Sequence, residues 1–132
     1  MLASRRRPGV VVLGATVLLF LLPAAPALAA NGLLVNSVKM VDNLVHINVS
    51  YNCDAPVDRI LGVAFKDQDN LATKTAVPNC DGVRHTADLK APVKKGTIAK
   101  GDKVHVVAEL YREVNKTTKT VYVQKLRTLT VR

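Results

Sequence analysis

The feature that most constrains the fold is a strict alternation of side chains in the stretch NLVHINVSYNC, residues 43–53. Every second position from Val45 to Cys53 is apolar, and the positions between them are mainly polar. A period of two with β-branched residues on one side is typical of a strand that buries one face. The stretch therefore predicts a half-buried β-strand that carries Cys53 on its core face.

Six further stretches have the composition of strands. The turn pair Asp81–Gly82 and the polar stretch REVNKTTKT separate two pairs of them. No helical period is sustained after residue 30. The pattern predicts an all-β, immunoglobulin-like antiparallel β-sandwich of about seven strands. The additional strands are expected at 34–40, 59–65, 72–77, 83–90, 103–112 and 120–131.

Two irregularities in this pattern carry predictions of their own. The segment KAPVKKGTIAKGD, residues 90–102, is the longest connection and is expected to cross from one sheet to the other. In the last stretch the alternation slips near Gln124–Lys125, which predicts a β-bulge or a break into two strands.

The N-terminus has the three parts of a secretory signal peptide. The basic residues Arg5–Arg7 precede the apolar run Val10–Leu22, and the small residues ALA end at Ala29. An uncleaved membrane anchor is the rival reading. The apolar run is short for a spanning helix, which needs about 20 residues, and Pro23 interrupts the helix that would continue it.

We therefore expect cleavage after Ala29, with Ala30 as the alternative site. The predicted organisation is a signal peptide at 1–29 and one β-sandwich domain at 30–132, without a transmembrane segment in the mature chain. The protein is expected to be secreted and to lie either outside the cell or at the cell envelope.

The chain has two cysteines, Cys53 and Cys80. In an oxidising compartment such a pair usually forms a disulfide, and we predict one here. A catalytic thiol would need a low-pKa thiolate, and His85 lies five residues from Cys80. A zinc site would normally need four ligands and a Cys-x-x-Cys pair. The disulfide is the favoured interpretation.

The arrangement resembles an uncharacterised family of small secreted proteins from high-GC Gram-positive bacteria. The resemblance rests on the motif YNC at 51–53, on a following strand with a central glycine, and on the motif CDGVRH at 80–85. It implies a signal peptide, one disulfide and a small β-sandwich, and it implies no activity. The antibody family is not indicated, since Tyr-x-Cys lies at the first cysteine and tryptophan is absent.

Catalytic and metal sites are weakly supported. The three histidines are expected on three different strands, with His46 and His105 facing away from the core and His85 on an apolar face. Neither serine of the mature chain lies in a nucleophile turn. No catalytic residue, metal site or cofactor is predicted, and an enzyme is not expected.

The stretch FKDQDNLAT, residues 65–73, suggests a calcium-binding loop. Asp67, Asp69 and Asn70 offer oxygen ligands there. The glycine and terminal glutamate of the full loop pattern are missing. A solvated acidic turn is the favoured reading.

Charge is the strongest functional signal. The full chain carries a net charge of +9, and three positive charges belong to the predicted signal peptide. Residues 30–89 hold five Lys or Arg and seven Asp, whereas residues 90–132 hold eleven Lys or Arg and three acidic residues. A basic half of this kind attracts anionic polymers, although surface lysines can also serve solubility alone. The predicted contact residues are Lys90, Lys94, Lys95, Lys100, Lys103, Lys116, Lys119, Lys125 and Arg127.

These observations predict a secreted, non-enzymatic binding protein that contacts an anionic cell-envelope polymer or an extracellular protein. Exposed sheet edges offer a route to a protein partner by strand addition. The alternative is an inhibitor of an extracellular hydrolase that uses a loop at 67–79. Sequence-specific nucleic-acid binding is not expected, because stacking aromatics are few and no recognition helix is visible. The ligand and the oligomeric state stay open.

Overall fold

A computed structural model describes residues 31–132, which form one compact unit of antiparallel strands. The predicted signal peptide at 1–29 lies outside the described residues. The strands are β1 (Gly32–Val41), β2 (Leu44–Asn52), β3 (Arg59–Asp67), β4 (Asn70–Ala76), β5 (His85–Lys95), β6 (Lys103–Asn115) and β7 (Thr118–Thr130).

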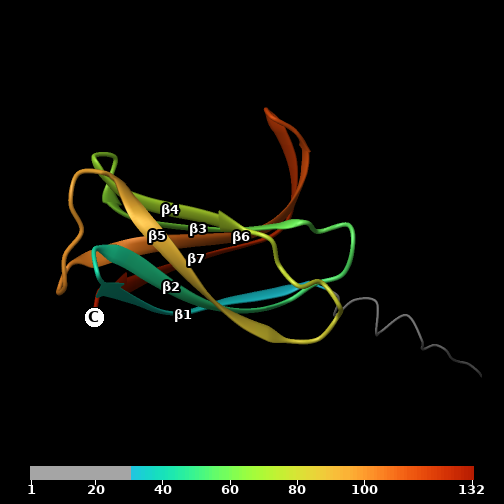
Figure 1. Ribbon diagram of the computed structural model, residues 1–132, viewed down its shortest axis with the longest axis horizontal. Coiled ribbons are helices and arrows are strands. Elements are labelled where there is room, and N and C mark those ends of the chain that lie inside the picture. Colours follow the sequence, from blue (N-terminus) through green and yellow to red (C-terminus); the bar gives the residue numbers. More distant parts are fainter. Residues whose placement is uncertain (1–30) are drawn as a thin grey trace, which may run out of the picture. The chain divides into compact units, whose positions relative to one another are not determined.

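The strands follow the order β1-β2-β5-β4-β3-β6-β7 in a sheet that curls into two layers (Figure 1). Strands β1, β2 and most of β5 form one layer, and β4, β3, β6 and β7 form the other. Strand β5 joins the layers: its first part pairs with β2, and its end pairs with β4 at Leu71–Lys95 and Ala72–Val93. The predicted immunoglobulin-like sandwich of seven strands is confirmed.

The first and last strands meet along the other side of the sandwich. The Met40 N–H donates to the Arg132 carbonyl over 2.9 Å, and the Arg132 N–H donates to the Val38 carbonyl over 3.0 Å. The guanidinium of Arg127 donates to the Val35 carbonyl over 2.6 Å. These bonds satisfy part of the edge that β1 would otherwise expose.

The core lies between the two layers and follows the predicted alternation. Val45, Ile47, Val49, Tyr51 and Cys53 are all buried from β2 and the residue after it. In β1, which was predicted at 34–40, a bulge between Val35 and Ser37 shifts the inward positions and interrupts the alternation. The facing layer contributes Ile60, Ala64, Ala72, Val104, Val106, Ala108 and Leu110.

Gly62 lets the two layers approach each other closely. It is buried on the inner side of β3, between Ile60 and Ala64. A Cβ atom added to it would lie 2.8 Å from Leu89 Cδ1 and 3.2 Å from Ile47 Cδ1. The space that a side chain at residue 62 would occupy is therefore filled by two side chains from the opposite layer.

Two details of the sequence prediction are corrected. The connection predicted at 90–102 is longer than the observed one, because β5 continues to Lys95. The strand β5 itself, and not the connection, passes from one layer to the other. The irregularity of the last strand lies at Val121–Val123, opposite Leu110–Tyr111, rather than at Gln124–Lys125. The apparent slip arises because Lys125 pairs with Ala108 on the inner side, at the open edge of the layer.

We expect Gly62→Val to lower the free energy of unfolding by about 1–3 kcal/mol, because it overfills the space that Leu89 and Ile47 occupy. Val63→Ile, one residue away on the opposite face, should change stability by less than about 0.5 kcal/mol. Urea denaturation of both variants measures the difference. Equal losses in the two variants would contradict the close packing at Gly62.

Candidate functional site

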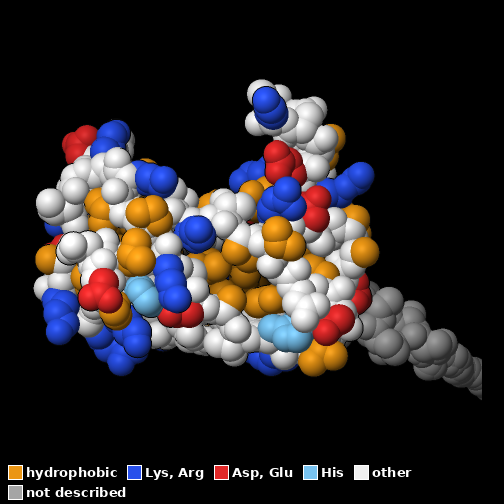
Figure 2. Space-filling view, viewed as in Figure 1, with side chains coloured by type: hydrophobic (Ala, Val, Ile, Leu, Met, Phe, Trp, Pro, Cys, Tyr) orange, Lys and Arg blue, Asp and Glu red, His pale blue; other side chains and the backbone are white. Residues whose placement is uncertain are grey.

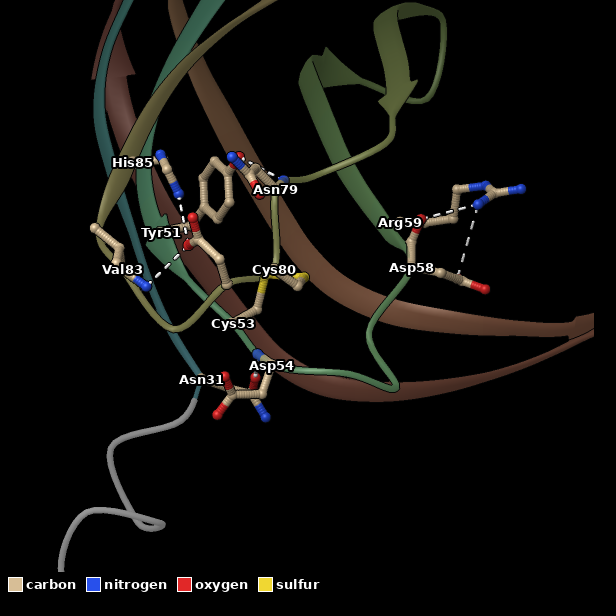
Figure 3. Close-up of a disulfide and its surroundings, with 11 residues drawn as sticks. Asn31, Tyr51, Cys53, Asp54, Asp58, Arg59, Asn79, Cys80, Val83 and His85 are labelled. Atoms are coloured by element: carbon tan, nitrogen blue, oxygen red, sulfur yellow. Dashed lines mark hydrogen bonds and ion pairs between the residues drawn. A yellow bond between two sulfur atoms is a disulfide. The ribbon is translucent and has the colours of Figure 1, made fainter.

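The disulfide organises one end of the sandwich (Figure 3). Cys53, directly after β2, is bonded to Cys80 in the connection between β4 and β5. The Gly82 N–H donates to the Cys53 carbonyl over 2.9 Å, and the Asn79 N–H donates to the Tyr51 hydroxyl over 3.0 Å. The predicted disulfide is thus present, and both cysteines of the chain are used in it, which leaves no thiol for catalysis.

His85 and Asp81 form a small polar cluster on this connection. The His85 ring nitrogen Nε2 lies 2.8 Å from Asp81 Oδ1, and the His85 ring lies 5.7 Å from the Tyr51 ring. The Val83 N–H donates to the same carboxylate oxygen over 3.0 Å. The hydrogen bond from His85, followed by that from Val83, lowers the pKa of Asp81 from its ordinary value. The cluster holds the loop in place and contains no nucleophile.

The three histidines are held separately. The His46 ring lies 2.7 Å from an Asp88 oxygen, and the His105 ring lies 3.0 Å from the Thr128 hydroxyl. Within residues 31–132 no group of three His, Cys, Asp or Glu side chains is arranged to hold a metal ion.

The acidic turn between β3 and β4 uses its polar groups internally. Asp67 Oδ1 accepts hydrogen bonds from the Asp69 N–H over 2.8 Å and from the Asn70 side chain over 2.9 Å. These bonds, the one from Asp69 above all, lower the pKa of Asp67. The Asn70 side-chain oxygen accepts from the Thr97 N–H over 2.8 Å. The Asp67 and Asn70 side chains, two of the three singled out for calcium, therefore close a turn and fasten it to the β5–β6 connection.

The nine predicted contact cations are distributed over β5, β6, β7 and the connections between them. Lys116 and Lys119 lie on the β6–β7 hairpin, and Lys125 and Arg127 lie further along β7. Lys119 pairs with Glu109 over 2.6 Å, so it has a structural role, as Arg127 does at β1. The other five lie on β5, on the β5–β6 connection and at the start of β6, and all are exposed: Lys90, Lys94, Lys95, Lys100 and Lys103.

A hollow of about 250 Å³ lies where β4 and β5 diverge. It is lined by Lys74 and Lys94 together with Thr73, Thr75 and Pro92. Neither lysine forms an ion pair within the described residues, and the lining contains no acidic side chain. Sequence reasoning missed Lys74, because the basic half was defined as starting at residue 90; only the pairing of β4 with β5 brings Lys74 beside Lys94.

A second polar hollow, of about 400 Å³, lies at the base of the β6–β7 hairpin, beside Thr75 and Tyr111. Next to it, Glu109 is buried, with 7% of its surface exposed. Its carboxylate accepts hydrogen bonds from Lys119 Nζ and from Gln124 Nε2, each over 2.6 Å. The Lys119 nitrogen also lies 4.8 Å from the centre of the Tyr111 ring. These contacts fix the root of the hairpin.

The prediction of an inhibitor loop at 67–79 is largely wrong. Residues 70–76 form strand β4, and the exposed connection at this end begins at Val77. In this connection Val77 is 77% exposed and Val83 is 58% exposed, on either side of the bridged Cys80.

Comparison of the chain with protein-family models, with curated proteins and with solved structures finds no match. Between Asn31 and Arg132 the structure has no helix of the length and apolarity that crossing a membrane requires.

Removing the disulfide is expected to lower the free energy of unfolding by roughly 3 to 4 kcal/mol, because it closes a loop with a sequence separation of 27 residues. Urea denaturation of the oxidised protein, of the reduced protein and of the Cys53→Ala/Cys80→Ala variant measures the loss. Unchanged midpoints after reduction and in the variant would show that the bridge does not stabilise the fold.

Replacing His85 by Phe is expected to raise the pKa of Asp81 towards its ordinary value. Because the folded-state pKa is lowered, the contact stabilises the fold above the ordinary pKa, and this stabilisation is lost as the pH falls through the lowered value. Carboxyl-detected NMR titration measures the shift. Asp102, whose pKa is lowered first by the Ala99 N–H, serves as the control that should not move; an unmoved Asp81 would contradict the assignment.

Proposed function

We propose that residues 30–132 form an exported, non-enzymatic binding domain that contacts an anionic polymer of the cell envelope. The observation that supports this best is the hollow between β4 and β5, whose lining includes both Lys74 and Lys94 and no acidic side chain. Two ammonium groups beside threonine hydroxyls suit a phosphate or carboxylate group of a repeating polymer.

Further exposed lysines follow and precede the hollow in the sequence. Lys90 lies on β5, Lys100 lies on the β5–β6 connection, and Lys103 begins β6. None of the three forms an ion pair among the described residues. A surplus of such charges raises the local concentration of a polyanion at low ionic strength, and several weak contacts along one polymer add up.

The test is co-sedimentation of purified residues 30–132 with isolated Gram-positive cell walls across a salt series, with walls stripped of their anionic polymers in parallel. All described core residues lie between Leu33 and Val131, so this fragment contains a complete core. Binding should fall as salt rises, because the charges are screened. It should also be lost on the stripped walls.

The decisive variant is Lys74→Gln with Lys94→Gln, which should weaken binding at low salt by about tenfold or more. The matched control, Arg84→Gln with Lys125→Gln, removes the same net charge from exposed positions outside the hollow. Equal losses in both variants would assign the effect to net charge alone. Absence of binding at every salt concentration would refute the proposal.

A second candidate function is inhibition of an extracellular hydrolase by the connection from Val77 to Val83. Two exposed apolar side chains on a disulfide-anchored segment would enter a cleft at low entropy cost. Such a complex would persist at high salt, unlike polymer binding. Val77→Asp should abolish it and leave binding to cell walls unchanged.

A further inference from the structure

Strands β1, β2 and β5 carry a basic row on the side of their layer that is turned away from the core. The register places Lys39 of β1 opposite His46 of β2, and His46 opposite Lys90 of β5. Paired residues of antiparallel strands lie on the same side of a sheet. This side faces outward, because Val45 and Ile47, the neighbours of His46 along β2, are buried in the core. Both lysines are exposed, and neither forms an ion pair among the described residues.

The layer around this row has little negative charge. Its three strands contain one acidic residue, Asp88, and the lysines Lys39, Lys90, Lys94 and Lys95. Figure 2, compared with Figure 1, shows Lys and Arg side chains gathered over the end of the molecule where β2 begins and β5 ends. Lys39 belongs to the part of the sequence in which acidic residues outnumber basic ones. Only the pairing of β1 with β2 and of β2 with β5 brings it near Lys90.

His46 sets the charge of this row. Its ring nitrogen Nδ1 lies 2.7 Å from Asp88 Oδ2, and its side chain is 11% exposed, so the ring lies below the two flanking lysines. The charged side chains that face it are Lys39 from β1 and Lys90 and Asp88 from β5, and no further strand of residues 31–132 covers this side. While the ring is neutral, the Asp88 carboxylate offsets one ammonium charge. Once the ring takes up a proton, its charge and that of Asp88 cancel, and both lysine charges act in full.

The row shares strand β5 with the hollow that Lys74 and Lys94 line. Lys94 follows Lys90 by four residues, a distance of about 13 Å along a strand. Pro92, between them, belongs to the lining of the hollow. A chain with repeated anionic groups can therefore reach both places at once, whereas one small anion occupies only one of them. Two contacts made by one chain bind more tightly than either contact alone.

We propose that the row of Lys39, His46 and Lys90 is a second anion subsite, an inference that rests on the proposed function because both subsites hold the same anionic polymer. The two ammonium groups of the row contact one anionic group of the polymer, and the hollow holds another. The polymer accordingly follows β5 from the outer side of its layer to the gap beside β4. Uptake of a proton by His46 strengthens the row, because it neutralises Asp88.

The row is tested apart from the polymer by titrating residues 30–132 with inorganic phosphate at low salt and about pH 5.5, followed by two-dimensional NMR of the backbone amides. The resonances of the row and of the hollow should both shift. Lys39→Gln with Lys90→Gln should abolish the shifts at the row and keep those at the hollow, and Lys74→Gln with Lys94→Gln should do the reverse. Shifts confined to the hollow in the native protein would overturn the second subsite.

The contribution of the row to polymer binding is measured by co-sedimentation with isolated Gram-positive cell walls at low salt. Lys39→Gln with Lys90→Gln should weaken binding by about fivefold or more. The matched control, Arg84→Gln with Lys125→Gln, removes the same net charge from outside both subsites and should weaken binding less. Equal losses in the two variants would assign the effect to net charge and overturn the subsite. Circular dichroism and urea denaturation check that the variants are folded.

The role of His46 is tested by comparing wall binding at about pH 5.5 and about pH 8, a range in which histidine changes its charge. The native protein should bind about threefold more tightly at the lower pH, and His46→Gln should remove this gain. His85→Gln is the matched control, because His85 also contacts a carboxylate, that of Asp81, but is paired in register with Tyr51 and not with a lysine. It should keep the gain. A gain that survives in His46→Gln would overturn the role of this histidine.

The second subsite and the proposed function fail in different ways. Phosphate shifts at the row without any binding to cell walls would refute the polymer as the ligand and leave an anion site at the row. Wall binding that depends on Lys74 and Lys94 but is unchanged in Lys39→Gln with Lys90→Gln would refute the second subsite and leave the proposed function in place.

Discussion

The contact of Gly62 with Leu89 and Ile47 sets how closely the two layers of the sandwich approach. Leu89 lies on β5 and pairs with Ile47 on β2, so both side chains enter from the same layer at one place. Beyond this contact β5 leaves β2 and joins β4 within one strand. The gap that opens where β5 departs from β4 is the hollow beside Lys74 and Lys94. A central core contact and a charged surface feature thus both depend on the course of β5.

Glu109 has a comparable influence on the other end of the molecule. A buried carboxylate is costly unless its oxygens are satisfied, and here each oxygen accepts a bond from a β7 side chain, Lys119 or Gln124. Because both donors come from the same strand, the carboxylate fixes β7 against β6 just below the free part of the hairpin.

The alternation of apolar and polar residues and the presence of two cysteines made much of this fold predictable. The alternation in β2 correctly assigned the inward face, and two cysteines in a chain with a predicted secretion signal correctly indicated a bridge. What failed depends on pairing between distant strands. The bulge in β1, the passage of β5 between layers and the meeting of Lys74 with Lys94 arise from register, which no local pattern encodes. The apolar stretch at 59–65 correctly predicted strand β3, but its composition, apolar at successive positions, does not tell which side faces the core.

Salt distinguishes the two candidate functions. At physiological ionic strength, interactions between exposed charges are screened beyond about 8 Å. Screening leaves an apolar contact of Val77 and Val83 unaffected. Raising salt therefore weakens binding of a polyanion at the Lys74–Lys94 hollow, while insertion of the connection from Val77 to Val83 into a cleft persists. Because the hollow is lined by residues of β4 and β5 and the connection begins only after β4 ends, each surface can be altered without changing the residues of the other.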